Sequence, residues 1–195
     1  WGDSEIYMRG FASENVAVMV NGIPMNDMEN GTVYWSNWQG LSDVTSVMQT
    51  QRGLGASKVS APSVGGTINI VTKGIHAAQG GMASLSVGSH GYNKLTFAIN
   101  SGLLDNGWSL SLLGSRTSGN GYFQGGDFEM YSYFVNATKL IGDNHQLIFT
   151  GFGAPQKHYS RSNALTSAEW AKVRQLYNLK DWREYNPDYG FDSKG

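Results

Sequence analysis

The stretch SVGGTINIVTK, residues 63–73, places two adjacent glycines directly before a run with strand alternation. Ile68 and Ile70 fall on one face of the predicted strand, and mostly polar residues alternate with them on the other. Glycine has no Cβ, so it lets one backbone cross closely over another. Gly65 and Gly66 therefore place a flexible hinge just before the strand, and a β-bulge or a hairpin corner would explain the pair.

The composition of the whole chain favours strands and turns. Among its 195 residues are 26 glycines and 4 prolines, and only 15% of the residues are charged. The chain has no cysteine, which excludes a disulfide scaffold and a thiolate zinc site. Its formal net charge of -1 offers no broad basic field for nucleic acid. No apolar run reaches the roughly 18 residues of a transmembrane helix.

Several short elements are predicted before residue 73. A first strand ends at Arg9-Gly10, and a second, VAVMV, is closed by Asn21-Gly22, the dipeptide best suited to a tight hairpin turn. A turn-rich loop with large aromatic side chains covers residues 25–38, and a further strand covers residues 44–52.

After Lys73 the pattern becomes a series of strands separated only by turns. Apolar residues alternate with small polar residues in the segments 81–89, 92–100, 108–116, 129–140 and 145–153. A membrane β-barrel and a soluble sandwich both produce this alternation, with opposite faces in contact with the core. After a very short first connection, the order short, long, short, long is typical of a barrel whose first strand runs outward. In the last long connection, Thr166 and Glu169 form a capping box that predicts a short amphipathic helix.

Signatures of enzymes and metal sites are missing from the sequence. It contains no nucleophile elbow, P-loop or zinc-protease motif, so we expect no enzyme. The four histidines are scattered, and Asp127 and Glu129 lie beside glycines in a long loop, where carboxylates are usually solvated. Asp27, Glu29 and Asn30 lack the spacing of a calcium loop. We therefore expect no metal and no cofactor.

Four short segments, in this order and spacing, resemble the second half of the plug domain of TonB-dependent outer-membrane receptors: IYMRG (6–10), VAVMVNGIP (16–24), QRG (51–53) and GGTINIVTK (65–73). The alternating strands that follow resemble the start of the barrel of that family. Three further segments resemble the branch often preceded by a carboxypeptidase-regulatory-like domain: NGTVYWSNW (30–38), FGAPQKH (152–158) and YNPDYGF (185–191).

The resemblance implies a mixed α/β plug followed by antiparallel transmembrane β-barrel strands, a fragment of a larger plugged barrel. Residues 1–75 would be the C-terminal part of the plug, and residues 76–195 the first five or so barrel strands with external loops. Because a plugged transporter has about 22 strands, we expect the native protein to continue well past residue 195.

The resemblance also implies roles for particular residues. The loop after VAVMVNGIP would face the external vestibule and bind ligand, through Asn26, Asp27, Tyr34, Trp35 and Trp38. For the aromatic residues, wedging the plug against the barrel wall is the competing interpretation. Arg9 and Arg52 would contact the barrel wall, and Gly65 and Gly66 would form the hinge between plug and barrel, where the backbone would make a tight crossing.

The function implied is import across the outer membrane of a Gram-negative bacterium by a multi-pass protein. An external glycan, peptide or metal chelate would bind, and TonB would move the plug through an N-terminal segment that this sequence does not contain. Outer-membrane lipid and a surface lipoprotein are the other partners that the resemblance allows. Two rival hypotheses remain: a β-rich surface module that binds glycans as an adhesin, and a fragment of a secreted hydrolase.

Overall fold

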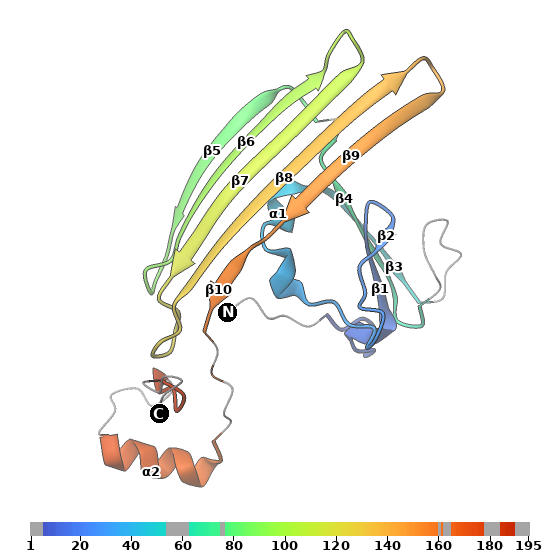
Figure 1. The fold of residues 1–195 in the computed structure, drawn as a ribbon. Helices are drawn as coiled ribbons and strands as arrows, with labels where there is room; N and C mark the ends of the chain where they lie inside the picture. Colours follow the sequence, from blue (N-terminus) through green and yellow to red (C-terminus); the bar gives the residue numbers. More distant parts are fainter. Residues whose placement is uncertain are drawn as a thin grey trace.

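A computed structural model describes residues 6–53, 63–74, 77–159, 161, 165–177 and 184–189. They form two sheets, one short and one long and curved, with the short sheet beside one face of the long one (Figure 1). We call the first the small sheet, with strand order β2-β1-β4-β3, and the second the long sheet, with order β10-β8-β7-β6-β5 and β9 also paired to β8. No helix in the described part of the chain is long and apolar enough to span a membrane.

The small sheet contains β1 (Val16–Val20), β2 (Ile23–Pro24), β3 (Thr45–Arg52) and β4 (Gly66–Thr72). β4 pairs with β1 in parallel and with β3 antiparallel. The predicted hairpin turn is confirmed, because Val20 pairs with Ile23 across Asn21 and Gly22, whose φ values are 51° and 81°.

The prediction of a strand that ends at Arg9-Gly10 was wrong. Only an isolated bridge joins Met8 to Phe11. Arg9 and Gly10 both have positive φ, 56° and 81°, so the chain reverses direction before a ladder can extend.

The two glycines of the opening stretch lie at a crowded crossing. A Cβ on Gly65 would lie 2.7 Å from the backbone oxygen of Asn15, and a Cβ on Gly66, whose φ is 134°, would collide with the backbone oxygen of Gln51. The predicted tight crossing is therefore present, and any larger residue would push β4 away from its neighbours.

The long sheet contains β5 (Gly80–Val87), β6 (Asn93–Leu103), β7 (Trp108–Gly119), β8 (Phe128–Ile141), β9 (His145–Gly153) and β10 (Gln156–His158). All its pairings are antiparallel. The short turns 104–107 and 142–144 meet at one end, and the connections 88–92 and 120–127 meet at the other (Figure 1). The strands thus match the five predicted segments, with β10 added.

The faces of the long sheet decide between the two interpretations that the alternation left open. Its outward face exposes large apolar side chains, including Leu85, Phe97, Ile99, Leu110, Leu112, Tyr133 and Phe149. Its inward face buries small polar side chains, including Thr96, Ser109, Ser111, Ser132, Asn136 and Thr138. A soluble sandwich has the reverse arrangement, whereas a membrane barrel has this one.

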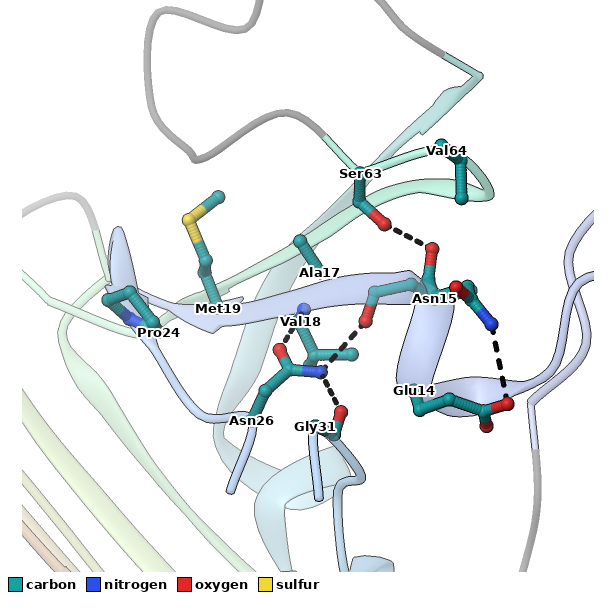
Figure 2. Close-up of a pocket in the computed structure, with 11 residues that line it drawn as sticks. Glu14, Asn15, Ala17, Val18, Met19, Pro24, Asn26, Gly31, Ser63 and Val64 are labelled. Atoms are coloured by element: carbon teal, nitrogen blue, oxygen red, sulfur yellow. Dashed lines mark hydrogen bonds between the residues drawn. The ribbon is translucent and has the colours of Figure 1, made fainter. Parts of the chain in front are cut away.

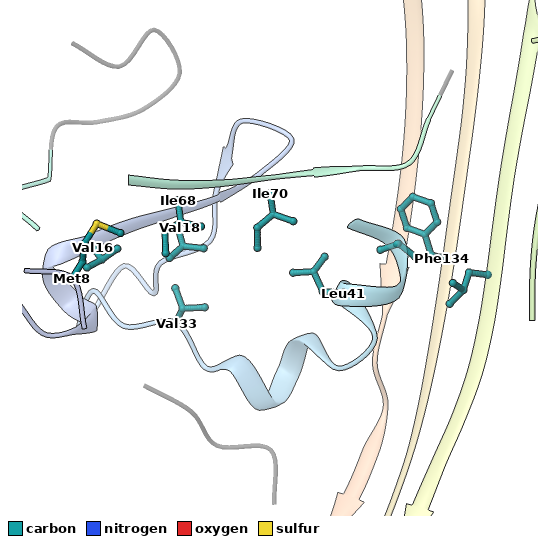
Figure 3. Close-up of a cluster of buried hydrophobic side chains, with 10 residues drawn as sticks. Met8, Val16, Val18, Val33, Leu41, Ile68, Ile70 and Phe134 are labelled. Carbon is teal, nitrogen blue, oxygen red and sulfur yellow. The ribbon is translucent and has the colours of Figure 1, made fainter. Parts of the chain in front are cut away.

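The two sheets meet at one apolar cluster, drawn in Figure 3. Leu113 and Phe134 of the long sheet pack with Leu41 and Val44 of α1 (Leu41–Val44), and the cluster continues to Ile68 and other buried residues of the small sheet. Apolar contact therefore seats the small sheet on a wall whose other inward side chains are mostly polar.

The remaining helices are η1 (Ser13–Asn15), η2 (Trp35–Trp38) and α2 (Ser167–Tyr177). At the start of α2, the Thr166 amide and hydroxyl donate to Glu169 Oε2 at 2.7 and 2.8 Å. The Glu169 amide donates to Thr166 Oγ1 at 3.4 Å. The predicted capping box is therefore confirmed.

Candidate functional site

The segment from Asn26 to Trp38, which we call the apex segment, carries all five predicted ligand-binding residues. Asn26 is half-buried and bonds to backbone on three sides (Figure 2). Its Oδ1 accepts from the Val18 amide at 2.8 Å, and its Nδ2 donates to the backbone oxygens of Val16 and Gly31 at 2.9 and 2.7 Å. The Asn26 side-chain amide thus bonds to the edge of β1 beyond the point where the short β2 ends. Both hydrogens of its Nδ2 donate hydrogen bonds.

Asp27 organises the next turn. Its Oδ1 accepts from the backbone amides of Glu29 at 2.8 Å and Asn30 at 3.1 Å, and Asn30 Nδ2 donates to the Tyr34 hydroxyl at 2.6 Å. This is an Asx turn. Among the described residues, no group of His, Asp and Glu side chains could hold a metal ion.

A pocket of about 430 Å³ lies between the apex segment and β1. Asn26 and Gly31 line one side and Ser63 and Val64 the other, with the start of β1 as the floor (Figure 2). The Ser63 hydroxyl donates to the Asn15 backbone oxygen, which ties the segment before β4 to this wall. The pocket therefore brings a predicted ligand residue next to the opening stretch of the sequence.

The two tryptophans of the apex segment do not line this pocket. Trp35 is half-buried and packs against the apolar cluster. Trp38 stacks on Phe152 of β9, with ring centroids 5.7 Å apart and planes inclined by 11°. For Trp38 the wedge between the two sheets, the competing interpretation, is the observed arrangement.

An ion pair between α1 and the long sheet was not predicted. Lys94 Nζ of β6 lies 2.8 Å from Asp43 Oδ1 and 2.6 Å from Asp43 Oδ2, and Lys73 Nζ donates to the backbone oxygen of Asp43 at 2.9 Å. We call the Asp43 and Lys94 pair the seam pair. Beside it, Gly40 has a φ of 81° and lies so close to Ser132 Oγ of β8 that a Cβ would collide with it.

One sequence signal pointed to the seam pair. Lys94 has the same strand parity as Thr96 and Ala98, so the alternation placed a cation on the small, polar face. Nothing in the sequence named its partner, because Asp43 lies 51 residues away in a separate element.

The predicted barrel contacts of Arg9 and Arg52 stay predictions. Both side chains are exposed, and neither forms an ion pair with any residue that the structure describes. The Arg9 guanidinium lies over Gly53 within the small sheet. The hinge role of Gly65 and Gly66 also stays a prediction, since a single conformation shows their packing and no motion.

Comparisons with known proteins agree with this geometry. The vitamin B12 transporter BtuB of Vibrio cholerae is 32% identical over 119 residues, which cover 61% of this chain and 19% of the transporter. The pyoverdine receptor FpvA of Pseudomonas aeruginosa has a TM-score of 0.62 at 16% identity, over 76% of this chain and 21% of the receptor. The ferric-catecholate import receptor Fiu of Escherichia coli has the same TM-score at 19% identity, over 78% of this chain and 22% of the receptor.

The chain has the fold of a TonB-dependent outer-membrane receptor. The predicted fold class of this receptor segment is therefore confirmed. The chain spans about a fifth of the length of the relatives it matches. Those relatives are transporters and receptors rather than enzymes. No protein-family profile matches the chain.

Proposed function

We propose that this chain is part of an outer-membrane receptor that imports an external ligand. The observation that carries the proposal is the distribution of side chains on the long sheet, with large apolar groups outward and small polar groups toward the small sheet. That distribution suits a strand wall with lipid on one side and a plugged lumen on the other. It gives no support to a soluble module, which would bury its apolar face.

In this proposal the small sheet belongs to the plug, residues 1–75, and the long sheet forms the first barrel strands, residues 76–195. The wall lies in the outer membrane of a Gram-negative bacterium. TonB supplies the force through a segment outside this sequence. The ligand shifts the plug from one conformational state to another because it binds the second state more tightly. A surface lipoprotein is a further partner that this branch of the family would allow.

The ligand would reach the plug at the apex segment, which lies toward the end of the long sheet that carries the long connections (Figure 1). Tyr34 is 50% exposed and Asp27 keeps one carboxylate oxygen outside its turn, so these two are the best placed to contact a ligand. Asn26 acts by holding the pocket wall, and Trp35 and Trp38 by seating the segment. A glycan, a peptide or a metal chelate would suit this mixture of aromatic and polar groups.

The proteins that this chain resembles transport or bind vitamin B12, pyoverdine, ferric catecholates and copper. Their variety supports import as the shared function and leaves the cargo of this chain to experiment. Arg9 and Arg52 would hold the plug in the barrel, and Gly65 and Gly66 would allow its movement.

Two measurements on the full-length protein test the proposal. The first is mobility on a denaturing gel with and without boiling, where a folded barrel migrates faster before heating. The second is accumulation of radiolabelled vitamin B12, ferric pyoverdine, a ferric catecholate, copper, maltooligosaccharides and oligopeptides by energised cells and by cells treated with an uncoupler. Import predicts a gel shift together with uptake of at least one probe that the uncoupler abolishes. A detergent-free soluble protein without a gel shift would refute the receptor and favour the adhesin, and binding without energy-dependent uptake would refute transport.

A further inference from the structure

Charged side chains lie at both ends of the outward face of the long sheet. At the end with the long connections, Arg116 of β7, Glu129 and Tyr131 of β8 and Lys157 of β10 form what we call the rim cluster. At the opposite end, Lys139 lies 5.5 Å from the ring centroid of Trp108. The outward positions of β7 and β8 between the two ends are uncharged: Leu110, Leu112, Gly114, Tyr133, Val135 and Ala137.

The spacing of these charges matches a bilayer. Lys139 lies ten positions after Glu129 on β8, which is about 34 Å along the strand and about 26 Å across a membrane for a tilt of about 40°. The apolar band of an outer-membrane barrel is about 25 Å tall. The rim cluster therefore lies at the level of the lipid headgroups, on the side of the longer connections, which is the outer leaflet in the proposed orientation.

Glu129 holds the rim cluster together. Its Oε1 accepts from Arg116 Nε at 2.9 Å, from Arg116 Nη2 at 2.6 Å and from the Tyr131 hydroxyl at 2.8 Å. The Arg116 guanidinium also lies 6.0 Å from the Tyr131 ring centroid. These contacts orient Arg116 on a face that is otherwise apolar, where a long flexible cation would not stay in one place without such support.

The cluster keeps donors that Glu129 does not use. Lys157 lies directly across from Glu129 in the β10 and β8 ladder, and its Nζ lies 5.6 Å from the Tyr159 ring centroid. Within the described residues, neither Arg116 Nη1 nor Lys157 Nζ donates a hydrogen bond. Two cations face one carboxylate, so the cluster carries one excess positive charge toward the lipid headgroups.

We propose that the rim cluster binds the phosphate of a phosphorylated glycolipid headgroup in the outer leaflet. Arginine and lysine donors recognise phosphate oxygens with charge-assisted hydrogen bonds. Tyrosine rings are common at the membrane interface, where they lie at the level of the lipid headgroups. The free side of Arg116 and the Lys157 ammonium would each donate to the phosphate, while Glu129 keeps the guanidinium in place. The site rests on the proposed membrane position of the long sheet and does not depend on transport.

Native mass spectrometry of the full-length receptor in detergent, titrated with bisphosphorylated lipid A, tests this site. The double variant Arg116→Gln/Lys157→Gln should bind lipid A roughly tenfold more weakly than the wild type. Lipid A with both phosphates removed should bind the wild type and the variant equally weakly. Lys157→Gln alone should weaken binding by about threefold, and among the described residues it breaks no side-chain hydrogen bond.

Lys139→Gln is the matched control, because it removes a cation from the same face at the opposite end of the band. It should leave lipid A binding unchanged, and the gel shift on boiling should be intact for every variant used. Equal lipid A binding by the wild type and both rim variants would overturn the proposal, as would dephosphorylated lipid A that binds the wild type as tightly as lipid A does. Displacement of lipid A by millimolar inorganic phosphate would assign the site to a soluble phosphate instead. A missing gel shift in the wild type would count against the membrane position itself, which separates that failure from a failure of the site.

Discussion

Replacing Lys94 by methionine should loosen the contact between the two sheets. The side chains of the seam pair are only 22% and 19% exposed, and Lys94 Nζ contacts both carboxylate oxygens of Asp43 at 2.8 and 2.6 Å. Exposed ion pairs contribute about 0.2–1 kcal/mol, whereas removing one partner of a buried pair costs about 3–5 kcal/mol. For a pair about four-fifths covered, we expect a loss of about 2 kcal/mol in the free energy of local opening.

Hydrogen exchange in the full-length receptor measures that opening. A loss of about 2 kcal/mol corresponds to about 30-fold faster exchange in α1 and the adjoining end of β3, if these amides exchange by local opening. Lys139→Met serves as the control, because it makes the same substitution on the outward face and should leave these amides unchanged. Adding Asp43→Asn to Lys94→Met should cause little further change, because the two residues act as a unit.

Two results would refute the reasoning about the seam pair. One is exchange in α1 within threefold of the wild type after Lys94→Met. The other is a double variant whose effect equals the sum of the two single effects, because that would mean Asp43 and Lys94 contribute independently.

Three further predictions concern the apex segment and α2. Trp38→Ala should destabilise the receptor by about 1–3 kcal/mol through loss of the stack on Phe152, and Trp38→Phe should retain most of it, which thermal unfolding in detergent would show. Asn26→Ala should cost about 2–3 kcal/mol because it removes three hydrogen bonds to the edge of β1 and to the apex loop, and an unchanged melting temperature would contradict this role. The Thr166 backbone amide, and after it the hydroxyl, hold the pKa of the Glu169 carboxyl below its usual value. The Glu169 carboxylate therefore contributes fully to the stability of α2 above the pKa that Glu169 has in the unfolded chain. That contribution is lost as the pH falls through the lower pKa that Glu169 has in the folded protein. The protection of the α2 amides, taken relative to the intrinsic exchange rate at each pH, should fall over that acidic range, and Glu169→Gln should remove this pH dependence.

Local patterns predicted much of this fold. The five downstream strands, the Asn21-Gly22 turn and the capping box before α2 each depend on neighbours in sequence, so the sequence alone was enough. The prediction of a short strand at residues 6–10 was wrong for an equally local reason, since Arg9 as well as Gly10 adopts positive φ. Alternation also predicted two distinct faces, but it could not tell which of them is outside.

Long-range partners account for what the sequence did not predict. Asn26 was expected to meet a ligand, yet its amide bonds to backbone groups that become available only because β2 ends early. Lys94 meets Asp43 across two sheets whose relative placement depends on the apolar cluster. The family resemblance pointed to arginines as the residues that hold the small sheet, whereas the ion pair observed at the seam uses a lysine.

The small side chains on the inward face of the long sheet have a consequence for hydration. Ser109, Ser111, Thr138 and their neighbours carry hydroxyl or amide groups that water can satisfy as readily as protein can. If the small sheet withdrew, the patch around Leu113 and Phe134 would meet water unfavourably. Where the hydroxyl and amide groups lie, the exposed wall would wet spontaneously, and a hydrated solute could slide along it without any change in the strands themselves.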